Sequence, residues 1–527
     1  MSYVETISIR VRPKLTSVSP PLPMLTTKKP RRSTPKVRSG CSTCKARRIK
    51  CDETTPECLR CVRTGRTCGG YTGPATARPS PAGSITTYSI PFKVPGSQVD
   101  RQLLHFYCSE AAERLAGFSD PTLWTQLILQ RCHHQPVIRS ALVGLSSLYL
   151  DHISDASNLP PVSLQCRSKS IEIISKCHRQ LTAHLRSPGA SVEVALICGL
   201  IFYTFECLLG DTKQATWHLD QGLRLLQGTL VENPTRFASL DGMSDQLMAI
   251  FARLDVQASI FDSDRFPGLR LLPPEDMASC SSALVPDFFV DSSHAENVLT
   301  RLQNITMHHI INYLDLKRCS WDQLPISVKS ERLAIVSSFQ TFQFATAELL
   351  ARIDQHQRPR QHVLLLQIQA ELFHGILVED NTLPPSMRDI GGAIDSHLEA
   401  ALTQISAILD MARTERESPL SGSGFMLSTQ LIASLYYICM KAQNRETRQL
   451  AVSLLLHSGV PEREGLWDAK TAAFVVESLI VNHDPGSSEG DRAEARLEDL
   501  GRGIVDCGGL DDAFRLLQIA KQGERVT

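Results

Sequence analysis

The sequence predicts a small metal-stabilised domain with two short helices near the N-terminus, followed by a large all-α domain. Three observations support this fold class. Six cysteines lie within a short segment, from Cys41 to Cys68. Lys and Arg are concentrated in and before that segment. After about residue 99, apolar residues recur with the spacing of buried helix faces over most of the chain.

The six cysteines form two equal halves. Each half has the spacing C-x2-C-x6-C, and six residues separate the halves; the positions are Cys41, Cys44, Cys51, Cys58, Cys61 and Cys68. Small polar loops of this kind hold no hydrophobic core, so another interaction must fix their conformation. Structural zinc takes four ligands in a tetrahedron, and C-x2-C supplies a typical pair of them.

Six thiolates can satisfy two zinc ions only if two sulfurs bridge both metals, because two tetrahedral sites need eight ligand positions. The internal repeat offers the first cysteine of each half, Cys41 and Cys58, as the bridging pair. The remaining two cysteines of each half would then complete one site each. Six thiolates and two zinc ions leave a net charge of minus two, and the surrounding Lys and Arg would help to keep the thiolates deprotonated.

Two other uses of the cysteines are less consistent with the sequence. A disulfide framework is typical of secreted chains shorter than about 100 residues. This chain has 527 residues, and its N-terminus has no apolar segment typical of a signal peptide. A single four-cysteine zinc site would leave two cysteines without a metal. We therefore favour a cluster of two Zn²⁺ ions per chain.

The segment between the second and third cysteines is strongly basic. It contains Lys45, Arg47, Arg48 and Lys50, with no acidic residue and no helix breaker, and it predicts a short helix in which residues 45 and 48 share one face, and 47 and 50 another. We expect Arg48 to contact bases, because Arg can donate to guanine O6 and N7. We expect Arg47 and Lys50 to contact phosphates. A solvated helix face is the alternative, but the enclosure by metal ligands favours nucleic acid.

Residues 38–71 resemble the zinc binuclear cluster DNA-binding domain of fungal transcription factors, with all six cysteines in place. The resemblance implies that the first and fourth cysteines bridge the two zinc ions. It implies that the basic helix enters the major groove at a CGG-type triplet, with Arg48 contacting the guanines. In that family the loop between the halves carries a proline that is often cis, and Pro56 matches it.

The neutral net charge of the chain hides an asymmetry. Residues 1–72 contain 16 Lys and Arg against 4 Asp and Glu, so the remainder carries 39 against 51. A basic N-terminal part on an acidic body fits DNA binding at one end and protein contacts at the other.

Two segments flank the cysteine cluster. Residues 1–37 predict a disordered basic arm, in which the cations at 28–32 form a candidate nuclear import signal or a contact to the DNA backbone: Lys28, Lys29, Arg31 and Arg32. Residues 72–98 predict a Pro-rich linker, and its five prolines exclude a continuous coiled-coil helix. Any homodimer would therefore form through the C-terminal body.

The body, residues 99–527, is expected to be helical throughout. Ala195–Leu209 is the most apolar run, and we expect a buried helix there and no membrane segment. The best short strand candidate is 284–290. Cysteines outside the cluster, such as Cys198, Cys207 and Cys439, are expected to be buried. Helices are expected near 161–186, 243–261, 294–318, 327–353, 360–377, 391–413, 425–442, 467–481 and 510–522.

The body also resembles the fungus-specific transcription factor regulatory domain, chiefly at 123–149 and 190–228. No catalytic motif is apparent, because neither histidine pair has metalloprotease spacing and no P-loop occurs. The sequence thus favours a nuclear regulator of RNA polymerase II genes that binds double-stranded DNA and contacts the transcription machinery or co-regulators. The alternative is a zinc-stabilised nuclear scaffold or co-regulator that does not recognise DNA sequence. A small-molecule sensor with a pocket in the body is compatible with the first hypothesis.

Overall fold

The structure is a computed structural model, and it describes residues 39–71, 95–156, 164–232, 243–262, 265–271, 285–316, 319–353, 358–379, 393–414, 424–442 and 444–476. The chain divides into two compact units, residues 1–86 and 87–527. The predicted basic arm with Lys28, Lys29, Arg31 and Arg32, most of the linker, and the helix expected at 510–522 lie outside the described residues.

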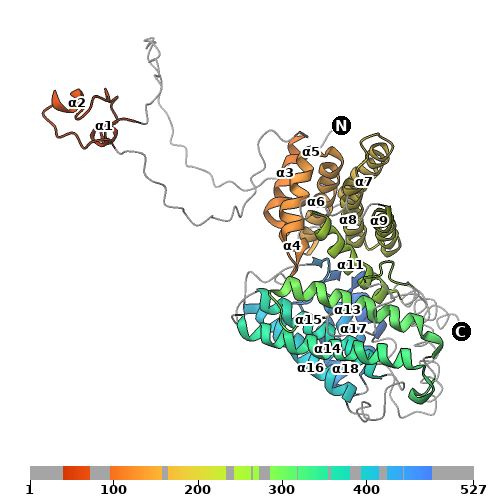
Figure 1. The fold of residues 1–527 in the computed structure, drawn as a ribbon. Coiled ribbons are helices and arrows are strands. Elements are labelled where there is room, and N and C mark those ends of the chain that lie inside the picture. The colour runs from red at the N-terminus through yellow and green to blue at the C-terminus, as the bar shows by residue number, and fades with distance from the viewer. Residues whose placement is uncertain are drawn as a thin grey trace, which may run out of the picture. The chain divides into compact units, whose positions relative to one another are not determined.

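The first unit contains two short helices, α1 (Ser42–Ala46) and α2 (Leu59–Val62), as the fold class predicts (Figure 1). Its buried interior is made of cysteines, with Cys68 and Tyr71 packed partly against them. The large apolar side chains on its helices, Leu59 and Val62, are exposed. The described part of this unit therefore has no aliphatic core, as expected for so short a segment.

The helix predicted over residues 45–50 is wrong in its extent. Helix α1 ends at Ala46, Arg48 adopts a left-handed backbone conformation with φ of 55°, and the N–H of Ile49 bonds to the Cys44 carbonyl at 3.2 Å. A helix continued from Cys44 to Cys51 would separate these residues by about 10 Å. The chain must instead turn back to bring Cys51 to the other sulfurs, so the predicted pairing of helix faces does not occur.

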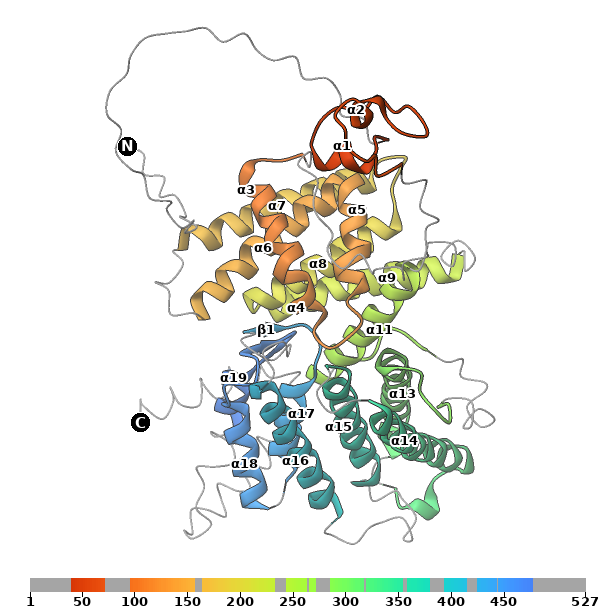
Figure 2. The same cartoon turned by 90° about the vertical axis from the view of Figure 1, so that its left-hand side faces the viewer.

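The second unit begins with a group of packed helices: α3 (Gln98–Phe106), α4 (Ala112–Ala116), α5 (Ile128–His134), α6 (Pro136–Ala156), α7 (Leu164–Leu185), α8 (Val192–Leu209), α9 (Thr212–Glu232) and α11 (Met243–Phe261). One π-helical turn, Tyr107–Ala111, joins α3 to α4, and a second, Leu123–Leu127, leads directly into α5. Helix α8 lies at the centre, contacting α6, α7, α9 and α11. Figure 2 shows these helices as one layer of the unit, with α11 at its border to the helices that follow.

The second group of helices is α13 (Ser292–Asn312), α14 (Ile326–Arg352), α15 (Arg358–Glu379), α16 (Ala393–Thr414), α17 (Leu431–Lys441), α18 (Arg445–Leu455) and α19 (Ala469–Val476), with 3₁₀ turns at Leu314–Leu316 and Trp321–Gln323. The helices predicted at 327–353, 360–377 and 391–413 are confirmed within two residues at their ends, whereas the helix predicted at 294–318 ends earlier, at Asn312. The helices predicted at 425–442 and 467–481 begin later, at Leu431 and Ala469, because short strands precede both. Helix α18 was not predicted.

Those strands form one small sheet in the order β1-β2-β3. Strand β1 (Phe425–Met426) is parallel to β2 (Arg463–Glu464), and β2 is antiparallel to β3 (Trp467–Asp468). The strand candidate at 284–290 is wrong, since the described residues 285–290 contain no strand. There Val285 and Phe289 are buried as separate anchors, whereas Phe288 and Val290 are exposed.

Helix α8 is the one described helix long and apolar enough to cross a membrane, and 78% of its apolar window is buried inside the protein. The predicted buried helix at 195–209 is thus confirmed. Cys198, Cys207 and Cys439 are also buried, as predicted. Two aliphatic cores result, a large one around α8 and a smaller one among α13, α14 and α15, and Ile260 packs against both.

Candidate metal centre and nucleic-acid interface

The first cysteine of each half caps a short helix. The Sγ of Cys41 accepts the N–H of Cys44 at 3.4 Å at the start of α1. The Sγ of Cys58 accepts the N–H of Cys61 at 3.3 Å at the start of α2. A thiolate at a helix N-terminus is favoured by the free N–H groups and the helix dipole. The C-x2-C spacing therefore places both sulfurs of each pair on the same turn.

The third cysteine of each half returns to the first by a second repeated hydrogen bond. The N–H of Cys41 donates to the Sγ of Cys51 at 3.5 Å, and the N–H of Cys58 donates to the Sγ of Cys68 at 3.5 Å. The two halves therefore have matching local geometry, as the sequence repeat suggests. The N–H of Glu53 also donates to Cys51, at 3.4 Å.

The six sulfurs gather into two overlapping groups of four. One consists of Cys41, Cys44, Cys51 and Cys58, the other of Cys41, Cys58, Cys61 and Cys68, and within each group the sulfurs lie within 4.8 Å of one another. Cys41 and Cys58 belong to both groups, with their Sγ atoms 3.6 Å apart. Zn–S bonds of 2.3 Å in a tetrahedron separate sulfurs by about 3.8 Å. The donor set thus fits two ions that share two thiolates, and none of these cysteines is in a disulfide.

The environment of these thiols requires positive charge. Burial opposes ionisation of Cys51, but the N–H groups of Cys41 and Glu53 outweigh it and lower the pKa of this thiol to about 6. By contrast, burial raises the pKa of Cys58 far above its ordinary value, although the N–H of Cys61 partly offsets this. Adjacent thiolates repel one another, so all six can ionise together only around cations.

The loop between the halves is held by Asp52. Its carboxylate accepts the N–H of Leu59 at 2.9 Å and the N–H of Arg60 at 3.3 Å, which caps α2. These hydrogen bonds outweigh burial and lower the pKa of Asp52. The Tyr71 hydroxyl donates to the Thr54 carbonyl at 2.9 Å, and the Thr55–Pro56 bond of this loop is cis. Neither Asp52 nor Tyr71 was predicted to have a role, and the only signal in the sequence is an Asp directly after a cysteine and before a turn.

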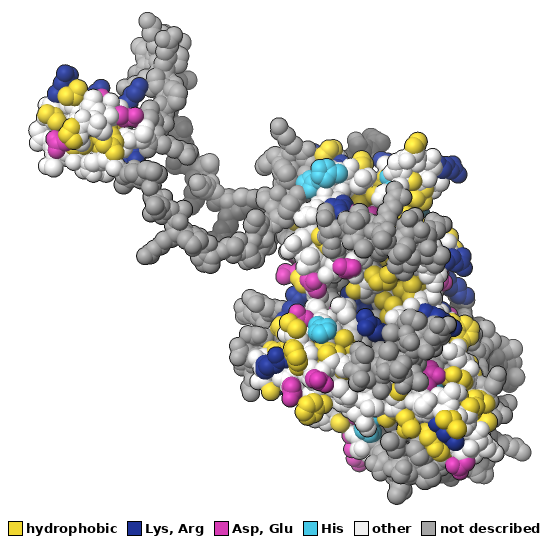
Figure 3. Space-filling view, viewed as in Figure 1, with side chains coloured by type: hydrophobic (Ala, Val, Ile, Leu, Met, Phe, Trp, Pro, Cys, Tyr) yellow, Lys and Arg dark blue, Asp and Glu magenta, His cyan; other side chains and the backbone are white. Residues whose placement is uncertain are grey.

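The predicted DNA-contacting side chains lie close together at the end of α1. Lys45, Arg48 and Lys50 are exposed, and Arg47 is half-buried, with its Nη1 donating to the Thr64 hydroxyl at 3.3 Å. The described part of this unit has seven Lys and Arg against three Asp and Glu. Figure 3 shows basic side chains gathered along one edge of the unit. The positive φ of Arg48 directs the chain away from the helix axis immediately after α1.

Comparison with known families assigns both parts of the chain. Residues 39–78 match the fungal Zn(2)-Cys(6) binuclear cluster domain, and residues 102–274 match the fungal specific transcription factor domain. The chain therefore contains a match to a zinc-cluster domain and a match to a transcription factor domain. The second match covers α3 to α11, so the predicted extension of this domain to residue 527 stays a prediction.

The relatives that match are transcription regulators. The aspercryptin biosynthesis cluster-specific transcription regulator atnN of Emericella nidulans is 26% identical over 246 residues, which is 42% of this chain and 39% of the relative. The transcription regulator lscL of Purpureocillium lilacinum is 27% identical over 205 residues, 34% of this chain and 46% of the relative. The chain thus aligns with less than half of the length of either. No solved structure matches.

Proposed function

We propose that this protein is a nuclear, zinc-dependent transcription regulator that recognises a CGG-like triplet in double-stranded DNA through its first unit. One observation carries the proposal: two tetrathiolate groups that share Cys41 and Cys58 lie directly beside an exposed basic segment. A rigid, metal-held support of this kind keeps a few cationic side chains in fixed positions, which sequence recognition requires.

Zinc is the metal that we propose, with two ions per chain. Cys44 and Cys51 would complete one tetrahedral site, Cys61 and Cys68 the other, and the shared sulfurs would bridge them. The sulfur separations support this arrangement. The metals supply the positive charge that holds six thiolates together, and they replace the missing aliphatic core.

Arg48 is the side chain that we propose for base recognition. Arg48 follows the last turn of α1 and is exposed, and its side chain makes no hydrogen bond or ion pair among those found for the described residues. A guanidinium in this position can donate to O6 and N7 of guanine in the major groove. Lys45 precedes it and Lys50 follows it in the sequence, and both would contact phosphates. Arg47 would do the same from a side chain steadied by Thr64.

Selection of binding sites from random duplexes by the zinc-loaded full chain tests this function. The expected result is enrichment of a CGG-like triplet that disappears when zinc is removed. A scaffold or co-regulator without sequence recognition predicts salt-dependent binding with no enriched triplet, and that result would refute the proposal. Spacing between two enriched triplets would reveal a homodimer, which we expect to form through the second unit.

The remaining parts of the proposal concern cellular context. We propose import into the nucleus through the basic cluster at Lys28, Lys29, Arg31 and Arg32, and contacts of the second unit with the transcription machinery or co-regulators. We expect no catalytic activity, since both matched domains are those of transcription regulators. Deletion of residues 28–32 in a fluorescently tagged chain tests the import signal.

A further inference from the structure

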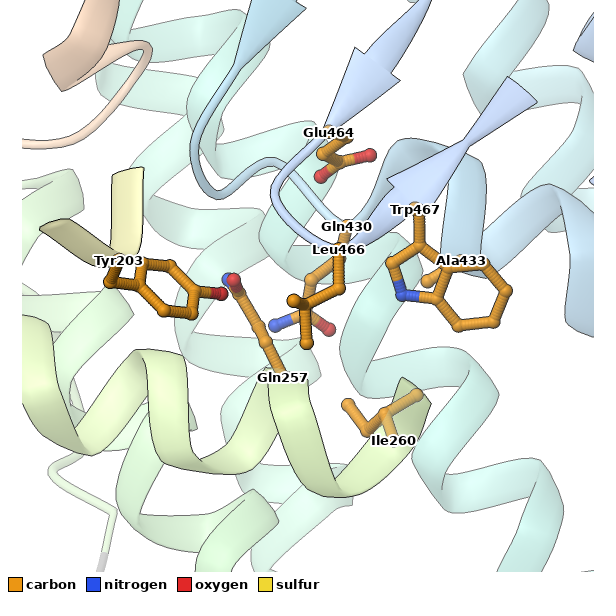
Figure 4. Close-up of a pocket in the computed structure, with 8 residues that line it drawn as sticks. All are labelled: Tyr203, Gln257, Ile260, Gln430, Ala433, Glu464, Leu466 and Trp467. Carbon is orange, nitrogen blue, oxygen red and sulfur yellow. The ribbon is translucent and has the colours of Figure 1, made fainter. Parts of the chain in front are cut away.

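A pocket in the second unit lies where the two groups of helices meet the small sheet. Eight residues line it: Tyr203 of α8, Gln257 and Ile260 of α11, Gln430 and Ala433 at the start of α17, and Glu464, Leu466 and Trp467 of the β2–β3 hairpin. Figure 4 shows Tyr203 and Trp467 on opposite sides, Glu464 above and Ile260 below. Segments more than 250 residues apart in sequence thus converge on one space.

Glu464 is the chemically unusual member of this lining. It is only 3% exposed. Its Oε2 accepts the N–H of Ile432 at 2.9 Å, but its Oε1 is buried without a hydrogen-bond partner. The adjacent cation, Arg463, pairs with Asp468 at 2.9 Å, and no ion pair to Glu464 occurs among the described residues. Burial outweighs the hydrogen bond from the N–H of Ile432 and raises the pKa of Glu464 to about 7.

A buried carboxyl group with one unsatisfied oxygen destabilises a fold unless something compensates it. The other polar groups of the lining are a phenol and two carboxamides, from Tyr203, Gln257 and Gln430, which can accept hydrogen bonds, and the indole N–H of Trp467, which can only donate. The aromatic ring of Trp467 forms the wall opposite Tyr203 (Figure 4). The Trp467 ring packs edge-on against Phe261 at 5.2 Å and lies 5.3 Å from Tyr436, so it is firmly held.

The backbone at this pocket is also strained or tightly constrained. Gln430 has a φ of 57°, a left-handed conformation that is unfavourable for a residue other than glycine, and its side chain makes no capping bond to α17. Gly465 has a φ of 52°, and a Cβ there would lie 2.9 Å from the Leu427 carbonyl oxygen. Strain of this kind concentrates at ligand sites. It fixes the turn that presents Glu464 and Trp467 to the pocket.

We propose that this pocket binds a primary ammonium group of a small organic amine, with Glu464 as the counter-ion and Trp467 as the aromatic wall. The pocket has about 290 Å³ of free space, counting its opening to solvent, and it has room for a group about the size of one water molecule. An ammonium group has that size. It donates up to three hydrogen bonds. The rest of the ligand extends towards the opening.

This inference goes beyond the proposed function, because it concerns ligand binding by the second unit and does not depend on DNA recognition. Isothermal titration of the zinc-loaded full chain with 2-phenylethylammonium chloride tests it, with 2-phenylethanol as the uncharged isostere. The expected result is saturable binding of the amine, at least tenfold tighter than that of the alcohol. Equal binding of the two compounds, or no saturable binding of the amine, overturns the inference; a pocket that holds only water gives the second result.

Two variants assign the binding to Glu464. Glu464→Gln keeps an acceptor for the N–H of Ile432 but removes the charge, and it should weaken amine binding at least tenfold. Glu206→Gln is the matched control: burial also raises the pKa of Glu206 to about 7, yet Glu206 does not line the pocket. The affinity of the Glu206→Gln chain for the amine should stay within twofold of that of the unmodified chain. Equal weakening by both variants contradicts the assignment.

If Glu464→Gln fails to fold, as judged by circular dichroism, Gln257→Met provides an independent test. Gln257 lies in the lining and is only partly buried, and methionine has a similar shape without a carboxamide oxygen. Weaker binding of the amine with unchanged binding of the alcohol supports the inference. Equal effects on both ligands contradict it.

Discussion

In the first unit the buried side chains are cysteines, and the apolar side chains of its helices face solvent; in the second, two aliphatic cores bury rows of Leu, Ile and Phe. The sulfurs of the first unit are held together by hydrogen bonds to backbone N–H groups and, as we propose, by metal. In the second unit, the described helices are held together by these aliphatic cores. One chain thus combines two sources of stability, and each can be removed separately.

The largest expected effect is that of metal removal. Chelation of zinc should unfold residues 41–68, because metal binding supplies the folding free energy of such a domain. The second unit should keep its helical circular dichroism and its melting temperature. Loss of specific DNA binding and exposure of the six thiols to alkylation measure the first effect. A single cooperative transition that abolishes both units would contradict this separation.

The converse experiment creates a cavity in the second unit and leaves the first unit intact. Phe342 of α14 is fully buried and packs against Phe289 with ring centroids 5.2 Å apart. Phe342→Ala should destabilise the second unit by about 3–5 kcal/mol. The zinc content and DNA affinity of the first unit should remain unchanged. Urea unfolding and metal analysis of the same sample measure both.

Phe344 provides the matched control, because it is on the same helix but 67% exposed. Phe344→Ala should change the free energy of unfolding by less than about 1 kcal/mol. Similar losses for the two variants would show that α14 packs differently from the structure described here.

Acid should destabilise the two units by different mechanisms. Burial opposes ionisation of Glu296, but Arg253 and His362 outweigh it and lower the pKa of Glu296 from 4.5 to about 2. Since this pKa is depressed in the folded state, its stabilisation is complete above pH 4.5 and is lost as the pH falls towards 2. The loss should be on the order of 3 kcal/mol. The first unit should release its metal earlier in the titration, because protons compete for the thiolates.

Urea unfolding at a series of pH values measures this contribution. Glu296→Gln should flatten the dependence of stability on pH between about 5 and 2. Glu462→Gln is the control, because Glu462 forms only an exposed ion pair with Lys470, and such pairs contribute little. An unchanged pH dependence in Glu296→Gln would show that the buried ion pair is not formed in solution.

The two units also differ in how far the sequence could predict them. In the first unit, the spacing of the cysteines predicted two short helices and the gathering of all six sulfurs, because metal geometry imposes strict spacing. The extent of α1 could not be predicted from helix propensity, since the return of Cys51 to the cluster overrides it. The role of Asp52 depends on contacts across the turn to Leu59 and Arg60.

In the second unit, periodicity predicted most long helices, because each buries a continuous apolar face. The sheet was missed, since strands of two residues carry no periodicity. The pocket around Glu464 was also beyond prediction. Its lining residues come from four segments of the chain, and local sequence does not reveal which distant residues meet.

The smallest expected effects distinguish side chains within the first unit. Arg48→Ala should lower the affinity for the selected DNA site by about 1–3 kcal/mol and relax discrimination at the guanines. Zinc content should not change, because Arg48 is exposed and contacts no ligand cysteine. Competition binding with duplexes substituted at each base of the triplet measures the change.

Lys50→Ala is the companion variant, because Lys50 is equally exposed and only two residues away. Loss of a phosphate contact should weaken binding to all sequences evenly and reduce the slope of log K against log salt by about 1. Affinities measured at a series of salt concentrations, on specific and unrelated duplexes, separate the two variants. If Lys50→Ala altered base preference and Arg48→Ala altered only the salt slope, the two side chains would have exchanged the roles proposed here, because a base contact changes specificity whereas a phosphate contact changes the number of counterions released.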